Sequence, residues 1–307
     1  MSDLKVTPPP ALHRGTGTRA LAADVLIALI PSALAGIWLF GLRACAVLAV
    51  CIGAAVSAET LACAVLRRPN SAGDLTCVIT GALLGLSLPV SIPLWQAALG
   101  AAAAVAFVKM LFGGFGCNFV NPAMAGRALL ALSFPAAMSA TVLPSAWQGA
   151  DITATATPLV DKATDLLPLF LGLHGGAIGE TCVPALLLGG LYLCIRRAIS
   201  PLVPLTMLGT VAALSALCGE PPLYAVMSGG VLFAAVFCVT DPVTTPVTRG
   251  GRVLFALLVG VLTVLLRRLS PASEGVMWAV LAANLLTPLM DKLPRPGLLG
   301  GRRRRHG

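Results

Sequence analysis

Long apolar stretches recur along the whole chain, and they restrict its fold more than any other feature. A helix that crosses a bilayer needs about 20 mostly apolar residues. Only 11% of the 307 residues are charged, whereas soluble domains carry about 25%. So few charges cannot cover a water-facing surface of this size. We therefore predict an all-α, polytopic membrane protein.

Ten segments are candidate membrane-spanning helices. They are residues 20–40, 44–66, 75–90, 94–112, 123–138, 181–195, 202–218, 223–239, 253–266 and 275–290. Several are short for a full crossing, and short segments broken by Gly or Pro are typical of helices that line an internal site. We therefore predict a first transmembrane half at residues 20–138 and a second at residues 181–290.

Basic residues predict the orientation, because loops rich in Lys and Arg stay in the cytoplasm. We place the N-terminal segment 1–19 there, and an even number of spans returns the basic tail 291–307 to the same side. The loop 139–180 is then extracytoplasmic. In this orientation the pair Arg267–Arg268 is also extracytoplasmic, which is one exception to the rule that basic loops are cytoplasmic. We expect a bacterial cytoplasmic (inner) membrane location and no cleaved targeting peptide.

Several classes of function lack a visible site. The net charge of +9 comes mostly from loops and the tail, so we expect no nucleic-acid binding. The chain has neither a phosphate-binding loop nor a dinucleotide fingerprint. Its nine cysteines form no C-x-x-C pair, and its three histidines form no haem-binding pair on the spans. We expect no metal site and no catalytic acid or nucleophile. Cys117, in a Gly-rich segment, either packs or faces a partner's metal centre.

A short sequence match relates the two halves. Residues 118–124 and 284–290 both follow the pattern N-x-x-[NT]-P-x-M. Because five spans per half is an odd number, a repeat of this kind would be inverted in the membrane. That architecture is common in proteins with a site at the membrane midplane. We therefore predict two five-helix inverted repeats.

The Gly-rich residues 113–116 precede the first copy of this motif. Glycine permits close backbone approach and unusual dihedral angles. The segment is either a broken helix that lines a cofactor or ion path, or a tight turn between helices. In the first case, the residues that line the pore or flavin site and stabilise the break are Gly113, Gly114, Asn118, Asn121, Asn284 and Thr287.

Five charged residues lie in or beside the spans, where burial of a charge costs about 2.5–3.5 kcal/mol. Asp24 and Lys109 are near span ends, where they could reach the headgroups; for Asp24 we favour helix capping or an ion pair with a neighbouring subunit. Glu59 is deeper, and Glu180 and Asp241 flank motif segments. These groups either bind or gate a translocated Na⁺ or H⁺, or they cap helices and pair with neighbouring subunits.

The loop carries an unusual run of hydroxyl groups, Asp151-Ile-Thr-Ala-Thr155-Ala-Thr157-Pro158. Pro158 disfavours a helical conformation at Thr157, so Thr157 would be presented on extended backbone to a modifying enzyme. From the residues alone, a Thr-rich loop without chemistry is the simpler explanation.

This run resembles the flavin-attachment site of the RnfD/NqrB family, most closely its RnfD branch. The resemblance implies that a flavin transferase outside the membrane links FMN to Thr157 through a phosphoester. It further implies support from Asp151, Thr155, Gly179 and Glu180. Other segments similar to the family are residues 109–124, 176–181, 228–230, 240–248, 274–275 and 284–288.

The resemblance also implies a function. The chain would be a subunit of an Rnf-type complex that passes electrons through the covalent FMN and couples this transfer to translocation of Na⁺ or H⁺. Its partners would be the other subunits of the complex, the flavin transferase during maturation, and membrane lipids. A second, non-covalent flavin in the membrane core belongs to the same expectation.

Two other functions fit parts of the sequence. A secondary transporter or channel without a redox role would share the ten spans, the inverted repeat and the broken helices. A scaffold subunit that has lost its flavin is the other, because Ala154 and Thr155 depart from the family's attachment pattern. The loop around Thr157 separates these hypotheses, since a permease does not need it.

Overall fold

Helices account for nearly all regular structure in the computed structural model, which describes residues 17–144, 154–155, 158, 165–269 and 275–292. The first group of elements is α1 (Thr18–Phe40), α2 (Leu42–Val65), η1 (Ala72–Asp74), α3 (Thr76–Ser87), α4 (Leu94–Ala103), the π-helical η2 (Ala104–Met110), α5 (Pro122–Ser133) and α6 (Pro135–Ser139). The loop holds β1 (Thr141–Val142), β2 (Ala154–Thr155) and α7 (Leu166–Leu171).

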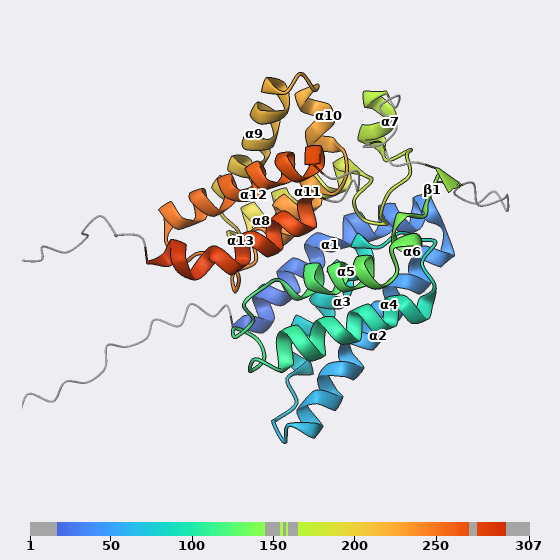
Figure 1. The fold of residues 1–307 in the computed structure, drawn as a ribbon. Coiled ribbons are helices and arrows are strands. Elements are labelled where there is room, and N and C mark those ends of the chain that lie inside the picture. Colours follow the sequence, from blue (N-terminus) through green and yellow to red (C-terminus); the bar gives the residue numbers. More distant parts are fainter. Residues whose placement is uncertain (1–16, 145–153, 156–157, 159–164, 270–274, 293–307) are drawn as a thin grey trace, which may run out of the picture.

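The second group of elements follows the loop. It comprises α8 (Val183–Ile195), α9 (Leu202–Leu217), α10 (Pro222–Met227), α11 (Val231–Phe233), the π-helical η3 (Ala234–Cys238), α12 (Arg249–Leu269) and α13 (Gly275–Asp291). Figure 1 shows the first group in blue to green and the second in yellow to red, each gathered on its own side of the bundle. Among the described residues, the strands are limited to the two-residue pair β1–β2. The predicted all-α class is confirmed.

Each of the ten predicted spans is helical over most of its length. The largest departure is residues 223–239, where a break at residues 228–230 separates α10 from α11 and η3. Two described helices, α1 and α2, are both long and apolar enough to cross a membrane, with mean hydropathy of 2.1 and 2.0. Others, such as α3 and α8, are apolar but shorter. Ten crossings therefore stay a prediction.

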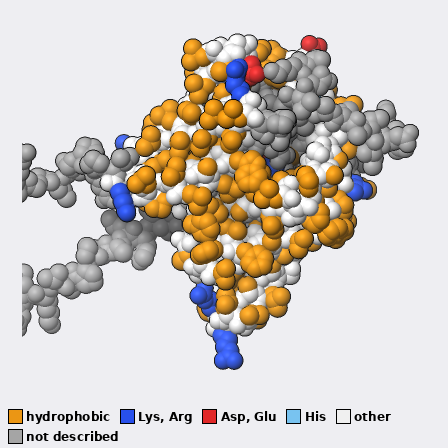
Figure 2. All heavy atoms as spheres, viewed as in Figure 1, with side chains coloured by type: hydrophobic (Ala, Val, Ile, Leu, Met, Phe, Trp, Pro, Cys, Tyr) orange, Lys and Arg blue, Asp and Glu red, His pale blue; other side chains and the backbone are white. Residues whose placement is uncertain are grey.

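The surface of the bundle is strongly apolar. Figure 2 shows hydrophobic side chains over most of one face, with Lys and Arg at its margins. Large apolar side chains are exposed on several helices, including Leu34 and Trp38 of α1, Leu61 of α2 and Leu205 of α9. Soluble monomers rarely expose apolar patches larger than a few hundred Å². Such a surface fits contact with lipid or with other membrane subunits, as the composition predicts.

α1 and α8 pack against each other and join the two groups of helices. A Cβ on Gly189 of α8 would overlap the carbonyl group of Ala28 in α1, and small residues permit such close approach of apolar helices. Asp24 of α1 adds to the contact, because it accepts hydrogen bonds from Tyr192 (3.0 Å) and Arg196 (3.1 Å). Asp24 is thus buried in an ion pair, and its partner belongs to this chain instead of to a neighbouring subunit.

The two copies of the N-x-x-[NT]-P-x-M motif occupy different positions in their helices. Asn121 is the N-cap of α5, where its Oδ1 accepts hydrogen bonds from the backbone N–H groups of Ala123 (3.0 Å) and Met124 (3.2 Å). Thr287 lies inside α13 and donates to the carbonyl group of Thr244 (2.9 Å). The two copies of the motif therefore do not occupy equivalent helix positions, and this motif gives no support to the predicted inverted repeat.

A different feature is common to the two groups of helices. η2 and η3 are both π-helical, and each is followed by a non-helical loop, at residues 111–121 and 239–248. π-Helical turns are rare and frequently occur at functional sites. Both loops contribute residues to one of the cavities described next.

Candidate functional site

One of the cavities in the described part of the bundle, cavity A, is where loop segments meet α5, α11 and α13. Its lining includes Arg127, Met138, Thr141, Pro158, His174, Glu180, Thr181, Gly229, Gly230 and Met277. These residues come from both groups of helices and from the loop predicted to carry a flavin.

Cavity A adjoins the predicted flavin-attachment segment. β2 pairs antiparallel with β1, so that Thr155 is opposite Thr141. The carbonyl group of Pro158 accepts a hydrogen bond from the hydroxyl of Tyr224 (2.6 Å), and Pro158 lines the cavity. The chain on both sides of residues 156–157 is thus fixed to the rest of the protein.

The structure describes only some of the residues predicted at the attachment site. Thr157 and Asp151 lie outside the described residues, and so does the side chain of Thr155. Glu180 lines cavity A. Gly179 instead packs on α3, where its N–H donates to the carbonyl group of Leu86 (2.7 Å). Gly179 therefore positions the loop, and Glu180 reaches the cavity.

Several buried polar atoms at cavity A have no hydrogen-bond partner in the described structure. Nε2 of His174 and Oγ1 of Thr181 belong to lining residues. Oγ of Ser228 is next to the lining residue Gly229 in the chain. A buried polar atom that stays unpaired costs about 1–3 kcal/mol. Such atoms gathered around one cavity fit a polar ligand.

Burial lowers the pKa of His174, and the carbonyl groups of Gly175 and Thr181 oppose this shift only in part. The imidazole is therefore neutral at pH 7. Its Nδ1 lies 3.1 Å from the carbonyl oxygen of Gly175. Nδ1 is thereby paired, whereas Nε2 forms no hydrogen bond of normal geometry with the described residues.

An ion pair forms part of the cavity wall. Arg127 of α5 pairs with Glu180 of the loop, and both side chains are nearly buried. A Cβ on Gly230 would lie 2.8 Å from the Glu180 carboxylate. Gly230 has φ +63°, which glycine adopts at no steric cost. Gly230 is therefore required both by its backbone conformation and by the space that Glu180 occupies.

Arg267 holds the break between α10 and α11. It belongs to the basic pair that the predicted orientation places outside the membrane, against the rule that Lys and Arg favour cytoplasmic loops. Arg267 of α12 donates hydrogen bonds to the carbonyl groups of Ala225 (2.8 Å), Ser228 (2.8 Å) and Gly229 (3.0 Å). These carbonyls belong to the end of α10 and to the break that follows it. Arg267 therefore fixes the backbone that forms one wall of cavity A.

The neighbouring Arg268 makes a similar contact at another helix end. It donates to the carbonyl group of Cys218 (2.7 Å), the C-cap residue of α9. Cations at helix C-termini stabilise the unpaired carbonyl groups there. Both Arg267 and Arg268 thus bind backbone carbonyl groups of this chain. These contacts explain why two arginines occur where the charge rule does not predict them. The departure of this pair from the charge rule was the sequence signal that could have identified Arg267.

Cavity B is the second cavity. Its polar lining residues are Thr18, Thr76, Thr80, Lys109, Asn118, Asn121, Thr240 and Asp241. The structure thus places Asn118 and Asn121 at a cavity, where sequence analysis expected them. Oδ1 of Asn118 is buried and has no partner in the described structure.

The other residues predicted to line the pore or flavin site, which are Gly113, Gly114, Asn284 and Thr287, line neither cavity A nor cavity B. Gly113 and Gly114 have positive φ and form a turn after η2, in which the N–H of Gly114 donates to the carbonyl group of Lys109 (3.0 Å). The structure therefore favours the tight-turn alternative for this segment. Asn284 is buried within α13, and its amide atoms have no described partner.

Asp241 lies at cavity B in the loop after η3. Burial raises the pKa of its carboxyl group, against hydrogen bonds from the N–H of Val243 (3.1 Å) and the hydroxyl of Thr244 (3.1 Å), which lower it. Cavity B therefore combines an acid with the unpaired amide oxygen of Asn118, in a lining that is otherwise largely apolar.

Two elements contribute to both cavities. Ala123 and Met124 are consecutive in α5, yet Ala123 lines cavity B and Met124 lines cavity A. In η3, Ala234 lines cavity A and Val236 lines cavity B. The two cavities are therefore neighbours along α5 and η3.

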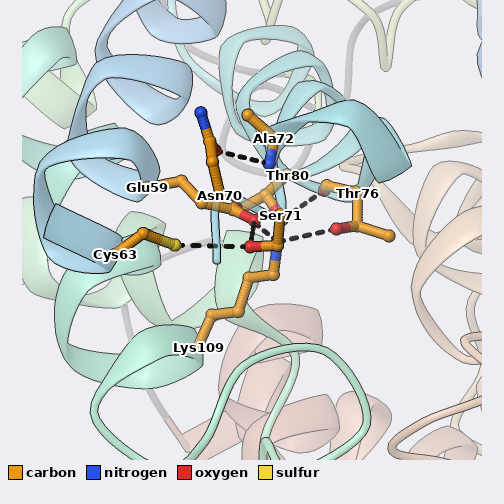
Figure 3. A network of polar contacts seen from close by, with 8 residues as sticks. All are labelled: Glu59, Cys63, Asn70, Ser71, Ala72, Thr76, Thr80 and Lys109. Atoms are coloured by element: carbon orange, nitrogen blue, oxygen red, sulfur yellow. Dashed lines mark hydrogen bonds and ion pairs between the residues drawn. The ribbon is translucent and has the colours of Figure 1, made fainter. Parts of the chain in front are cut away.

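A further polar group, the Glu59 cluster, consists of Glu59, Cys63, Ser71, Thr76 and Lys109 (Figure 3). Lys109 donates to Glu59 (2.5 Å) and to the hydroxyl of Thr76 (2.7 Å), and Ser71 donates to the second carboxylate oxygen (2.5 Å). Glu59 is 0% exposed and Lys109 is 2% exposed. Lys109 does not reach the headgroups, so that prediction is wrong. Glu59 pairs within this chain instead of with a neighbouring subunit.

Metal binding finds no support in the described part of the chain, where no three His, Cys, Asp or Glu side chains gather as a metal site would require. Cys117 is exposed in the turn after η2. Its sulfur lies next to Gly113, and both alternatives for Cys117 stay predictions.

Comparison with known proteins places this architecture in a family. The model of the NQR2, RnfD, RnfE family matches residues 5–300. A subunit of the Na(+)-translocating ferredoxin:NAD(+) oxidoreductase complex from Acetobacterium woodii is 36% identical over 97% of this chain and 96% of its own length. A subunit of the proton-translocating ferredoxin:NAD(+) oxidoreductase complex from Clostridium ljungdahlii is 38% identical over 91% of each chain.

A relative from another complex matches a smaller part. A subunit of the Na(+)-translocating NADH-quinone reductase from Chromohalobacter salexigens is 39% identical over 69% of this chain and 56% of its own length. Because the family model and the two relatives from ferredoxin:NAD(+) oxidoreductase complexes span nearly all of the sequence, the chain belongs to the NQR2, RnfD, RnfE family.

Proposed function

We propose that this chain is a multi-pass subunit of an ion-translocating oxidoreductase complex of the bacterial cytoplasmic membrane. It carries FMN on Thr157, passes electrons through that flavin and couples the transfer to translocation of Na⁺ or H⁺. The class of complex is supported by the relatives, which are subunits of Na(+)- and proton-translocating ferredoxin:NAD(+) oxidoreductase complexes. Both termini are cytoplasmic and the loop 139–180 is extracytoplasmic.

The observation that carries the flavin assignment is the set of unpaired polar atoms in cavity A, next to the attachment segment. The isoalloxazine ring has an edge of carbonyl and N–H groups. His174 and Thr181 offer polar atoms that lack partners, and Met138 and Met277 offer apolar contacts. The residues present therefore fit the polar edge of the ring. When bound, FMN supplies the electron-transfer chemistry, and the protein supplies its orientation and electrostatic environment.

The chain's own residues would hold the flavin in place. Tyr224 donates to the carbonyl group of Pro158 (2.6 Å), which follows Thr157 in the chain and lines cavity A. Arg127 is a buried cation in the cavity wall and is already oriented by Glu180. This arrangement would keep the flavin at a fixed distance from its electron partners, and electron transfer falls steeply with distance.

We further propose that cavity B binds the second, non-covalent flavin. The unpaired Oδ1 of Asn118 and the carboxyl group of Asp241 suit the N–H groups and hydroxyls of such a ligand. Because α5 and η3 line both cavities, the two flavins would be neighbours.

Four kinds of partner follow from this proposal. They are the other subunits of the complex, the flavin transferase during maturation, membrane lipids, and the translocated Na⁺ or H⁺. The exposed apolar surface of the helices supports contact with lipids and with membrane subunits. A basic tail on the cytoplasmic side would add contact with anionic lipid.

The test of this function is covalent flavin on a denaturing gel under ultraviolet light. We would co-express a flavin transferase with wild type, Thr157→Val and the matched control Thr155→Val. We expect fluorescence in wild type and Thr155→Val and none in Thr157→Val. Fluorescence that persists in Thr157→Val contradicts the attachment site. Absence of fluorescence in all three contradicts the redox role and favours a permease or a scaffold subunit.

A further inference from the structure

Arg267 differs from the other cations inside the bundle in the groups that surround it. Lys109 and Arg127 each pair with a carboxylate. The described hydrogen bonds of Arg267 all go to backbone carbonyl groups, and its buried Nε has no partner. Glu180 and Glu220 are close enough to act on it electrostatically.

Carbonyl dipoles stabilise a cation without cancelling its charge. Arg267 therefore places a cation at the break at residues 228–230. The ion pair of Arg127 with Glu180 is neutral as a unit. One of the carbonyls that Arg267 binds belongs to Gly229, which lines cavity A. The positive charge thus lies directly behind the cavity wall, where solvent screens it poorly.

We propose that Arg267 is a positioning residue that also tunes the redox centre: it closes the α10–α11 break and raises the reduction potential of a flavin in cavity A. The inference rests on the proposed function, because it needs a flavin at Thr157. Reduction adds negative charge to the ring, and a fixed nearby cation stabilises that charge. Removal of the cation therefore makes the flavin harder to reduce.

The experiment is a redox titration of the flavin absorbance in the purified complex. It compares wild type with Arg267→Gln, which can still donate to a carbonyl group but carries no charge, and with Arg267→Lys, which keeps the charge. Arg268→Gln is the matched control, because Arg268 is exposed and binds a carbonyl at α9 that is not part of cavity A.

We expect Arg267→Gln to lower the equilibrium constant for one-electron reduction about tenfold, which corresponds to a potential about 59 mV more negative. Arg267→Lys should stay near the wild-type potential, and Arg268→Gln should equal it. A wild-type potential in Arg267→Gln overturns the proposal. An equal shift in Arg267→Gln and Arg267→Lys also overturns it, since geometry and not charge would then set the potential.

A second variant covers the case in which Arg267→Gln does not fold. The imidazole of Arg267→His loses its charge above about pH 6.5, so its potential should fall relative to wild type between pH 5.5 and pH 8.5. A pH dependence equal to that of wild type overturns the proposal. Gel fluorescence of the same samples separates the two claims. Missing flavin in wild type refutes the proposed function, whereas attached flavin with an unshifted potential refutes only the role of Arg267.

Discussion

Cavity A and the Glu59 cluster are two groups of buried polar side chains in one helical bundle, and they differ in how completely their atoms are paired. In the Glu59 cluster, Lys109, Ser71 and Thr76 pair with Glu59 or with one another. At cavity A, Nε2 of His174 and Oγ1 of Thr181 have no described partner. Polar side chains thus pair with one another in the Glu59 cluster, whereas at cavity A some of them stay unpaired and can bind a ligand.

This difference in pairing separates buried polar groups that stabilise the fold from those that can bind a ligand. A buried ion pair with all its hydrogen bonds made holds helices in one arrangement. Unpaired polar atoms around a cavity cost stability, and a ligand that pairs them recovers that cost. We therefore assign the Glu59 cluster to the packing of α2, α3 and η2, and cavity A to the proposed cofactor.

The largest expected effect is at the Glu59 cluster. Lys109→Met leaves the Glu59 carboxylate buried without a cation, and we expect a loss of about 3–5 kcal/mol. The double variant Glu59→Leu/Lys109→Met removes both charges and should regain most of that loss. Thermal unfolding in detergent measures both. A double variant as unstable as Lys109→Met would contradict the assignment of this pair to packing.

The next effect is at the wall of cavity A. Gly230→Ala forces a side chain into a left-handed conformation, at about 1–2 kcal/mol, and also presses on the Glu180 carboxylate. Gly219→Ala is the matched control, because Gly219 has φ +81° but open space at its Cβ position. Thermal unfolding should show the greater loss in Gly230→Ala. Equal losses would mean that the Gly230–Glu180 contact has no energetic weight.

The smallest loss of stability that we expect at pH 7.5 is that of the variant His174→Phe. His174→Phe loses the contact with Gly175, at about 1 kcal/mol, while the unpaired Nε2 loses nothing. The pKa of His174 is lowered in the folded protein, so the unfolded chain takes up the proton first and stability falls as pH drops below about 6.5.

The variant His174→Phe lacks this proton uptake. Its loss of unfolding temperature between pH 7.5 and pH 5.5 should therefore be smaller than that of wild type. Equal losses in the two proteins would show that His174 is not held neutral at cavity A.

Features that depend on local composition could be predicted from the sequence. The apolar stretches place all ten helical segments, because twenty apolar residues without charge have few other stable states. Asn121 follows the N-cap preference of asparagine, although the sequence did not reveal that its counterpart, Thr287, lies inside a helix. The seven-residue pattern shared by residues 118–124 and 284–290 does not tell whether a copy lies at the start of a helix or inside it.

Features that depend on distant partners were not predictable. Lys109 was expected at the headgroups, but its partner Glu59 is 50 residues away in the chain. The carbonyl partners of Arg267 are 38 to 42 residues away. In both cases a charge near a span end has a partner that only the tertiary fold supplies. The role of Thr157 stays a prediction, because it lies outside the described residues.

The most direct measurement of the central claim is a density map of the assembled, flavinylated complex by cryo-electron microscopy. Our account predicts density continuous with the side chain of Thr157, with a planar ring whose polar edge enters cavity A beside His174 and Thr181. Ring density that leaves Thr157 away from the bundle, with cavity A filled by lipid or water, would contradict it. A map with no added density at Thr157 would contradict the electron-carrier role itself.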